Sequence, residues 1–213
     1  MDTANIVGSA SLIIAAWTVI VGINAWRREY VGKRNVEFAE EVLVLFYEAR
    51  DAIRFMRNPG GYVGEGSTRK AGPNESPEEK DIRDKAYVVF ERYNERKELF
   101  NKLYSMRYHY IARFGNTATN PFDDLQKLVN EIFISARMLT HYWMDQGHRK
   151  WKNDAEFRRH LAEMHKYEAV FWEMTPDRDQ ITPKVDAVIS EIEAKFARII
   201  SPSWFERIKQ WFI

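Results

Sequence analysis

Residues 6–34, IVGSASLIIAAWTVIVGINAWRREYVGKR, decide how the rest of the chain is interpreted. No charged residue occurs from Thr3 to Trp26, and these 24 positions would form a helix of roughly 36 Å. The hydrocarbon core of a bilayer is about 30 Å thick, and a run this long is stable there only as a helix. The stretch therefore predicts a transmembrane anchor over residues 1–26.

The charges that flank this run predict how the anchor is oriented. A cleaved signal peptide would carry positive charge before its apolar part, but only Asp2 precedes the run. Basic residues follow it instead and predict the cytoplasmic side of the anchor: Arg27, Arg28, Lys33 and Arg34. We therefore expect a retained single-pass anchor in the cell membrane, with the N-terminus outside and the C-terminal domain in the cytoplasm.

Small residues recur along the predicted span at alternating spacings of three and four, which draws one seam along a helix. The seam consists of Gly8, Ser11, Ala15, Thr18, Gly22 and Ala25. Small side chains let a second helix approach closely inside a membrane, so the seam predicts contact with another membrane protein or with further copies of this chain. The alternative is a small-residue helix that faces lipid only.

Composition indicates one ordinary helical domain behind the anchor. The chain has 213 residues, and 32 Lys and Arg balance 31 Asp and Glu to a net charge of +1, so nothing predicts a nucleic-acid partner. Cysteine is absent, which is compatible with a reducing compartment. We assign residues 27–200 to a cytoplasmic helical bundle.

The helical period continues from the anchor to Arg57, so we expect one rod from about residue 5 to Arg57 that ends at Asn58-Pro59. Residues 58–76, NPGGYVGEGSTRKAGPNES, form the one long loop, which we expect to be flexible. The loop does not match a phosphate-binding loop, because Gly66 is followed by Ser67 in place of lysine and no strand precedes it.

Cap signals predict the later helices. Ser76-Pro77 with Glu79 is a capping box that starts a helix ending near Gly115. Further starts are predicted at Asn120-Pro121, at Asn153 and at Thr182-Pro183. The predicted fold is all-α: a transmembrane helix that continues into an antiparallel bundle of about four to five helices.

Residues 201–213, SPSWFERIKQWFI, predict a short amphipathic helix at the C-terminus. Its apolar face would consist of Trp204, Phe205, Ile208, Trp211 and Phe212. Such a face fits a membrane surface, a partner's groove or the chain's own bundle, and the sequence leaves these three open.

Candidate chemistry is sparse. Glu156, His160, Glu163 and His165 have spacings that could hold a metal, but Arg158 and Arg159 beside them indicate a solvated face. Residues 147–160, GHRKWKNDAEFRRH, combine basic side chains with Trp151 and fit a solvated surface, an acidic partner or lipid, or less well a nucleic acid. No catalytic, cofactor-binding or metal-binding residue and no small-molecule substrate is predicted.

These observations predict a single-pass, membrane-anchored interaction or structural protein. It would be an accessory or assembly subunit of a membrane complex, or a homo-oligomer, and not an enzyme. Two alternatives stay open: a toxin-like or defence-like membrane effector whose span assembles in the bilayer, and a membrane-bound enzyme or metal-binding bundle.

Overall fold

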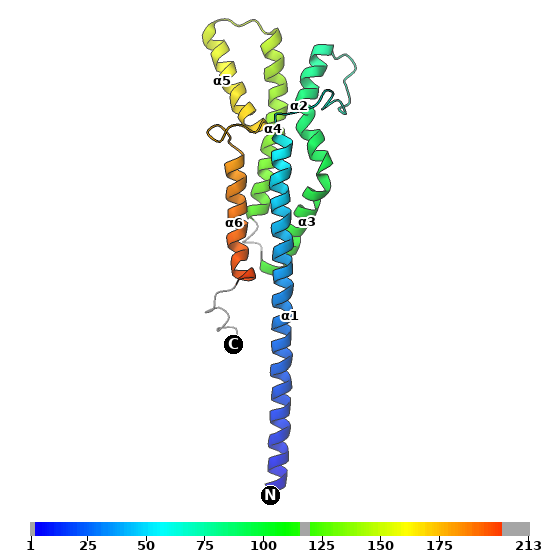
Figure 1. The fold of residues 1–213 in the computed structure, drawn as a ribbon, viewed down its shortest axis with the longest axis vertical. Coiled ribbons are helices and arrows are strands. Elements are labelled where there is room, and N and C mark those ends of the chain that lie inside the picture. The colour runs from blue at the N-terminus through cyan, green and yellow to red at the C-terminus, as the bar shows by residue number, and fades with distance from the viewer. Residues whose placement is uncertain (1–2, 116–119, 202–213) are drawn as a thin grey trace. The chain divides into compact units, whose positions relative to one another are not determined.

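The computed structural model describes residues 3–115 and 120–201, which contain helices and no strand (Figure 1). The side chains of residues 3–11, 13, 120 and 148 lie outside this description. The helices are α1 Thr3–Arg57, α2 Pro77–Glu95, α3 Lys97–Phe114, α4 Asn120–His148, α5 Asp154–Phe171 and α6 Thr182–Ile200. The predicted all-α class is thereby confirmed for the described residues, and α1 is continuous as far as Arg57, as expected.

The cap signals place the helix starts correctly. The Ser76 hydroxyl accepts the Glu79 N–H at 3.1 Å, and the Glu79 carboxylate accepts the Ser76 N–H at 3.0 Å, which completes the capping box of α2. Asn153 caps α5 by accepting the N–H of Glu156 at 2.9 Å. Each bond satisfies a backbone group that a helix terminus leaves without an internal partner.

The prediction of a single helix over residues 77–115 is wrong, because the chain leaves helical geometry at Arg96 (φ −110°, ψ 11°). The Tyr93 ring stacks on Phe100 across this break, with 4.9 Å between centroids, and meets Phe133 of α4 edge-on at 5.0 Å. Aromatic pairs at these distances contribute about 0.5–1.5 kcal/mol each beyond burial, so this cluster stabilises the bend. Neither glycine nor proline marks the break in the sequence.

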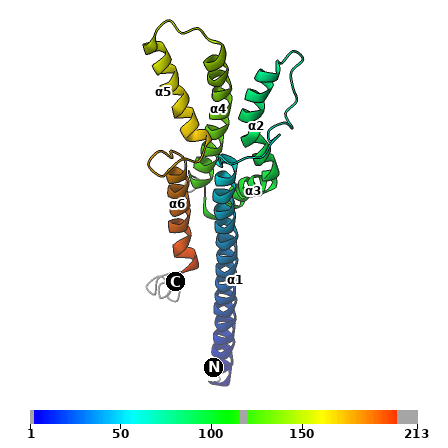
Figure 2. The same ribbon diagram turned by 45° about the horizontal axis from the view of Figure 1, so that its top comes forward.

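The chain forms two compact units, residues 1–41 with 195–213 and residues 42–194. In the second unit, α4 packs against α2, α3 and α5, and both ribbon views show α5 running beside α4 (Figures 1 and 2). The core of this unit is apolar; Phe46, Phe100, Phe122 and Ile132 are fully buried in it. Phe46 of α1 meets Phe122 of α4 edge-on at 5.0 Å, which joins α1 to α4.

Two buried arginines hold the helix ends of this unit. Arg92 of α2 is 3% exposed and donates to the carbonyl oxygens of Phe55, Asn58 and Gly60, which follow or end α1. Its guanidinium also forms a paired contact with Glu65, at 2.6 and 2.9 Å. Arg92 thus satisfies the carbonyl groups that the end of α1 leaves unpaired.

Arg57, the last residue of α1, does the same for the end of α5. It is 1% exposed and donates to the carbonyl oxygens of Ala169, Val170 and Trp172. Its Nη2 lies 2.9 Å from Asp179 in the turn before α6. Burial raises the pKa of Asp179, but hydrogen bonds from Arg57 and from the Thr182 and Ile181 N–H groups outweigh it and lower that pKa to about 2.

The loop 58–76 is packed against α2. Glu91 accepts the Gly66 N–H at 2.8 Å, while Arg69 binds Glu75 with both terminal nitrogens and Asp84 with its Nε at 3.0 Å. The hydrogen bond from Arg69 is the main cause of the lowered pKa of Glu75, about 2. The flexibility that we expect of this loop stays a prediction, but its contacts are specific.

Within the part of the chain whose side chains are described, no helix combines the length and the apolar character needed to cross a bilayer. The membrane-spanning role of residues 1–26 therefore stays a prediction.

Candidate functional site

The first candidate is the N-terminal part of α1, which exposes large apolar side chains all around the helix. Val19, Ile20 and Val21 are 59%, 57% and 43% exposed. Successive helical residues point about 100° apart, so three exposed neighbours cover most of the circumference. The full set is Leu12, Ile14, Trp17, Val19, Ile20, Val21, Ile23, Trp26, Tyr30 and Val31.

Four of the six residues of the small-residue seam are described, and they are exposed on the same segment. Ala15, Thr18, Gly22 and Ala25 are all exposed, and a Cβ atom added at Gly22 would meet no atom of another described segment within 4 Å. The side chains of Gly8 and Ser11 lie outside the described part of the chain. Helix–helix contact through this seam stays a prediction.

The predicted cytoplasmic-side residues Arg27, Arg28, Lys33 and Arg34 are also exposed. Next to them the Trp26 ring stacks on Tyr30 at 5.7 Å, and Arg34 donates to the Tyr30 hydroxyl at 3.4 Å. The predicted C-terminal contact residues Trp204, Phe205, Ile208, Trp211 and Phe212 lie outside the described residues.

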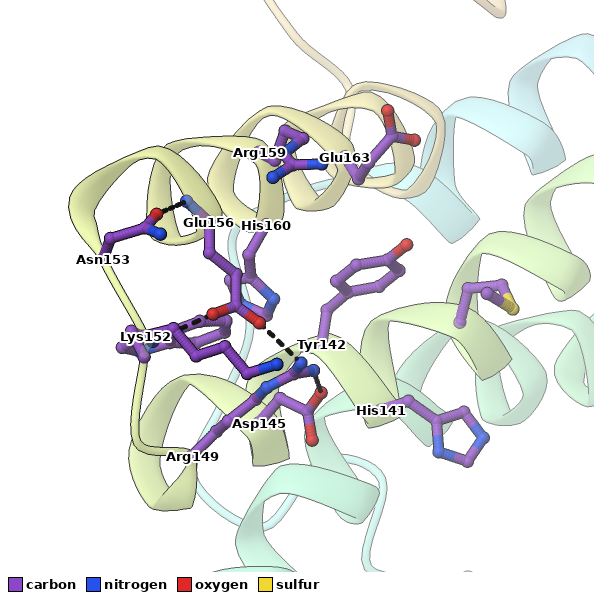
Figure 3. A pocket seen from close by; sticks show the side chains of 12 residues that line it. His141, Tyr142, Asp145, Arg149, Lys152, Asn153, Glu156, Arg159, His160 and Glu163 are labelled. Carbon is purple, nitrogen blue, oxygen red and sulfur yellow. Dashed lines mark hydrogen bonds and ion pairs between the residues drawn. The ribbon is translucent and has the colours of Figure 1, made fainter.

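The second candidate is a cleft of about 660 Å³ between α4 and α5 (Figure 3). Only five residues separate the end of α4 from the start of α5, which Asn153 caps. The first turns of α5 therefore lie near the last turns of α4. The cleft is lined by Met138, His141, Tyr142, Asp145, Arg149, Trp151, Lys152, Asn153, Glu156, Arg159, His160 and Glu163.

Arg149 joins the two sides of the cleft. It lies 3.3 Å from Asp145 of α4 and 2.9 Å from Glu156 of α5 (Figure 3). The other oxygen of Glu156 accepts the backbone N–H of Lys152 at 2.9 Å. That backbone hydrogen bond, helped by Arg149, lowers the pKa of Glu156, so its carboxylate is ionised at neutral pH.

The sequence predicts a solvated face in this region, and for His160 that prediction is wrong. His160 is only 8% exposed, with its ring 4.5 Å from Trp151 and 5.3 Å from Tyr142. Figure 3 shows it facing the space between α4 and α5. Its Nε2 atom is buried and has no hydrogen-bond partner among the described residues.

The metal interpretation of the same residues gains no support. Among the residues that the structure describes, no group of three or more histidine and carboxylate side chains is placed to hold a metal ion.

Sequence reasoning singled out residues 147–160 but missed the cleft that they form with α4. Tyr142 and His141 come from α4 and lie outside that segment. The available signal is the short connection between the predicted end at Gly147 and the predicted start at Asn153, which favours neighbouring helices that meet at these ends. Lys150 and Arg158, which belong to the basic segment, do not line the cleft.

No family model, no curated protein and no solved structure matches this chain.

Proposed function

We propose that this chain is a single-pass membrane protein whose helical bundle lies in the cytoplasm and presents an interaction surface. The observation that carries the proposal is the uncharged run from Thr3 to Trp26, together with the exposed apolar side chains of α1 between Leu12 and Val31. Water is an unfavourable environment for such a surface, and lipid tails are a favourable one.

The free energy of burying these apolar side chains favours a surface covered by lipid over one exposed to water. Fully burying one side chain of the size of Val, Leu or Ile stabilises by about 1.5–3 kcal/mol. Large apolar side chains with exposures between 43% and 73% line this segment of α1. Transfer of this set into lipid is therefore at least comparable in free energy to the stability of a typical folded domain, about 5–15 kcal/mol.

The remaining features extend the proposal to orientation and partners. Arg27, Arg28, Lys33 and Arg34 follow the apolar run and favour a cytoplasmic bundle. The exposed seam residues Ala15, Thr18, Gly22 and Ala25 favour contact with another membrane helix, from a second copy or from a different protein. The role is one of assembly in a membrane complex, without catalysis.

Cell fractionation tests the anchor. After lysis without detergent and ultracentrifugation, the full chain is expected in the membrane pellet, to resist an alkaline wash and to be released by detergent. A double variant with Ile14→Arg and Ile20→Arg is expected in the supernatant, because each arginine at the centre of a span costs about 2.5–3.5 kcal/mol.

Val44→Arg is the matched control, because Val44 lies on the same helix with 53% exposure but beyond the uncharged run. It should stay in the pellet. Recovery of the unmodified chain in the detergent-free supernatant would refute the proposal, and cleavage of the bundle by protease added to intact cells would refute its orientation.

A further inference from the structure

The cleft between α4 and α5 has the size and the composition of a small-molecule site. Its volume of about 660 Å³ lies within the range of roughly 300–1,000 Å³ typical of ligand pockets. Tyr142 and Trp151 are the aromatic side chains of its lining. Charged side chains from both helices, among them Asp145 of α4 and Glu156 of α5, line the same cleft (Figure 3).

The carboxylates of the cleft already have cationic partners. Asp145 and Glu156 share Arg149, and Glu163 pairs with Lys166, which lies outside the cleft lining. Two cations of the lining differ from this. The Lys152 ammonium group and the Arg159 guanidinium make no hydrogen bond or ion pair with any side chain that the structure describes. The cleft therefore holds two cations that lack a side-chain partner among the described residues, whereas each of its carboxylates has one.

His160 adds a third group of this kind at a buried position. A buried polar atom without a partner costs about 1–3 kcal/mol, so a hydrogen-bonding group bound in the cleft beside Nε2 would remove this cost. Unlike the two exposed cations, His160 cannot gain this partner from bulk solvent at its 8% exposure. The Nε2–H tautomer would be a donor, in line with the ammonium and guanidinium groups.

We propose that this cleft binds a small phosphate monoester that carries a planar ring. A phosphate monoester has a charge of about −1.5 to −2 at pH 7 and three strong acceptor oxygens, which fits donors on Lys152, Arg159 and His160. The ring lies against the Tyr142 and Trp151 side chains. This site is independent of the membrane anchor.

Calorimetric titration of the full chain in detergent micelles with phenyl phosphate tests this proposal. Phenol supplies the ring without the charge, and inorganic phosphate supplies the charge without the ring. Phenyl phosphate is expected to bind more tightly than both, and Lys152→Gln and Arg159→Gln are each expected to weaken it about tenfold, since each removes a charged hydrogen bond.

Lys150→Gln and Arg158→Gln are matched controls, because each removes the same charge from a neighbouring residue outside the cleft lining. They should change the affinity less than about twofold, since salt screens exposed charges. His160→Phe keeps an aromatic ring without the nitrogen and is expected to weaken binding while circular dichroism is unchanged. The Lys152 and Arg159 variants carry the test if His160→Phe does not fold.

Absence of phenyl phosphate binding at millimolar concentration would overturn the proposal, and so would equal losses in the Arg158→Gln and Arg159→Gln variants. Dihexanoyl phosphatidic acid, a soluble lipid with the same phosphate group and no ring, distinguishes the source. If it binds more tightly than phenyl phosphate and loses affinity in Arg159→Gln, the site belongs to a lipid headgroup and the ring-bearing ligand is wrong.

Discussion

At the scale of single residues, Arg57 connects parts of the bundle that lie far apart in the sequence. Its guanidinium binds three carbonyl groups near the end of α5 and the carboxylate of Asp179 before α6. Forming such a pair gives little net stability, because both charges lose their hydration. Removing one partner is different, since the other charge then stays buried alone.

We therefore expect Arg57→Met to destabilise the bundle by about 3–5 kcal/mol, because it leaves the buried Asp179 carboxylate without its cationic partner and removes the Arg57 donors from the carbonyl groups at the end of α5. Urea unfolding of the full chain in micelles, followed by circular dichroism, measures this change. Arg54→Met is the control: Arg54 is half-exposed and 3.3 Å from Glu173, so its loss should cost about 1 kcal/mol or less. Equal effects of the two substitutions would contradict the assigned role of Arg57.

At the scale of elements, the loop 58–76 and α2 approach each other at Gly66. A Cβ atom at this position would lie 2.0 Å from the carbonyl oxygen of Asp84, and the backbone has φ 86°. Gly64 has nearly the same φ, 87°, but its Cβ would find the nearest atom at 4.0 Å. Substitutions at the two glycines therefore distinguish the cost of backbone strain, which both share, from the cost of close packing, which only Gly66 has.

Gly64→Ala is expected to cost about 1–2 kcal/mol through the left-handed backbone alone. Gly66→Ala carries the same strain and should cost roughly another 1–3 kcal/mol, because the loop must move away from α2. Urea unfolding measures both values, and limited proteolysis of the loop should be faster only in the Gly66 variant. Indistinguishable stabilities would show that the loop does not pack closely here.

The elements also show what the sequence can predict and what it cannot. Caps are local, so Ser76, Asn153 and the prolines at 77 and 183 identify helix starts within a few residues. The break at Arg96 lies next to an aromatic contact with α4, and neither glycine nor proline marks it in the sequence. Charge patterns predict a solvated surface, so the burial of His160 and the cleft around it become visible only when two helices are placed together.

At the scale of the whole molecule, the two units carry different roles in our proposal. Residues 1–41 with 195–213 include the exposed apolar part of α1 and its basic residues, and residues 42–194 include most of the buried core and the cleft. Assembly in the membrane would depend on the first, and ligand binding on the second.

Assembly through the seam predicts that Gly22→Leu abolishes crosslinked species of the full chain, or its crosslinks to a partner, in membranes and mild detergent. A large side chain there would hold the facing helix away, and among the described residues no atom beyond the neighbouring helix backbone lies within 4 Å of a Cβ at Gly22. Ala16→Leu adds comparable bulk next to the seam but not on it, and should leave the crosslinks unchanged. If both variants crosslink like the unmodified chain, these small residues do not mediate assembly.

The long connection made by Arg57 also has a consequence for synthesis on the ribosome. Asp179 follows Arg57 by 122 positions, and at roughly 5–20 residues per second the nascent chain needs on the order of ten seconds to reach it. During that interval Arg57 lacks its anionic partner. We therefore expect the bundle to close late in translation, because a polypeptide terminated before Asp179 lacks the carboxylate that pairs with the Arg57 guanidinium.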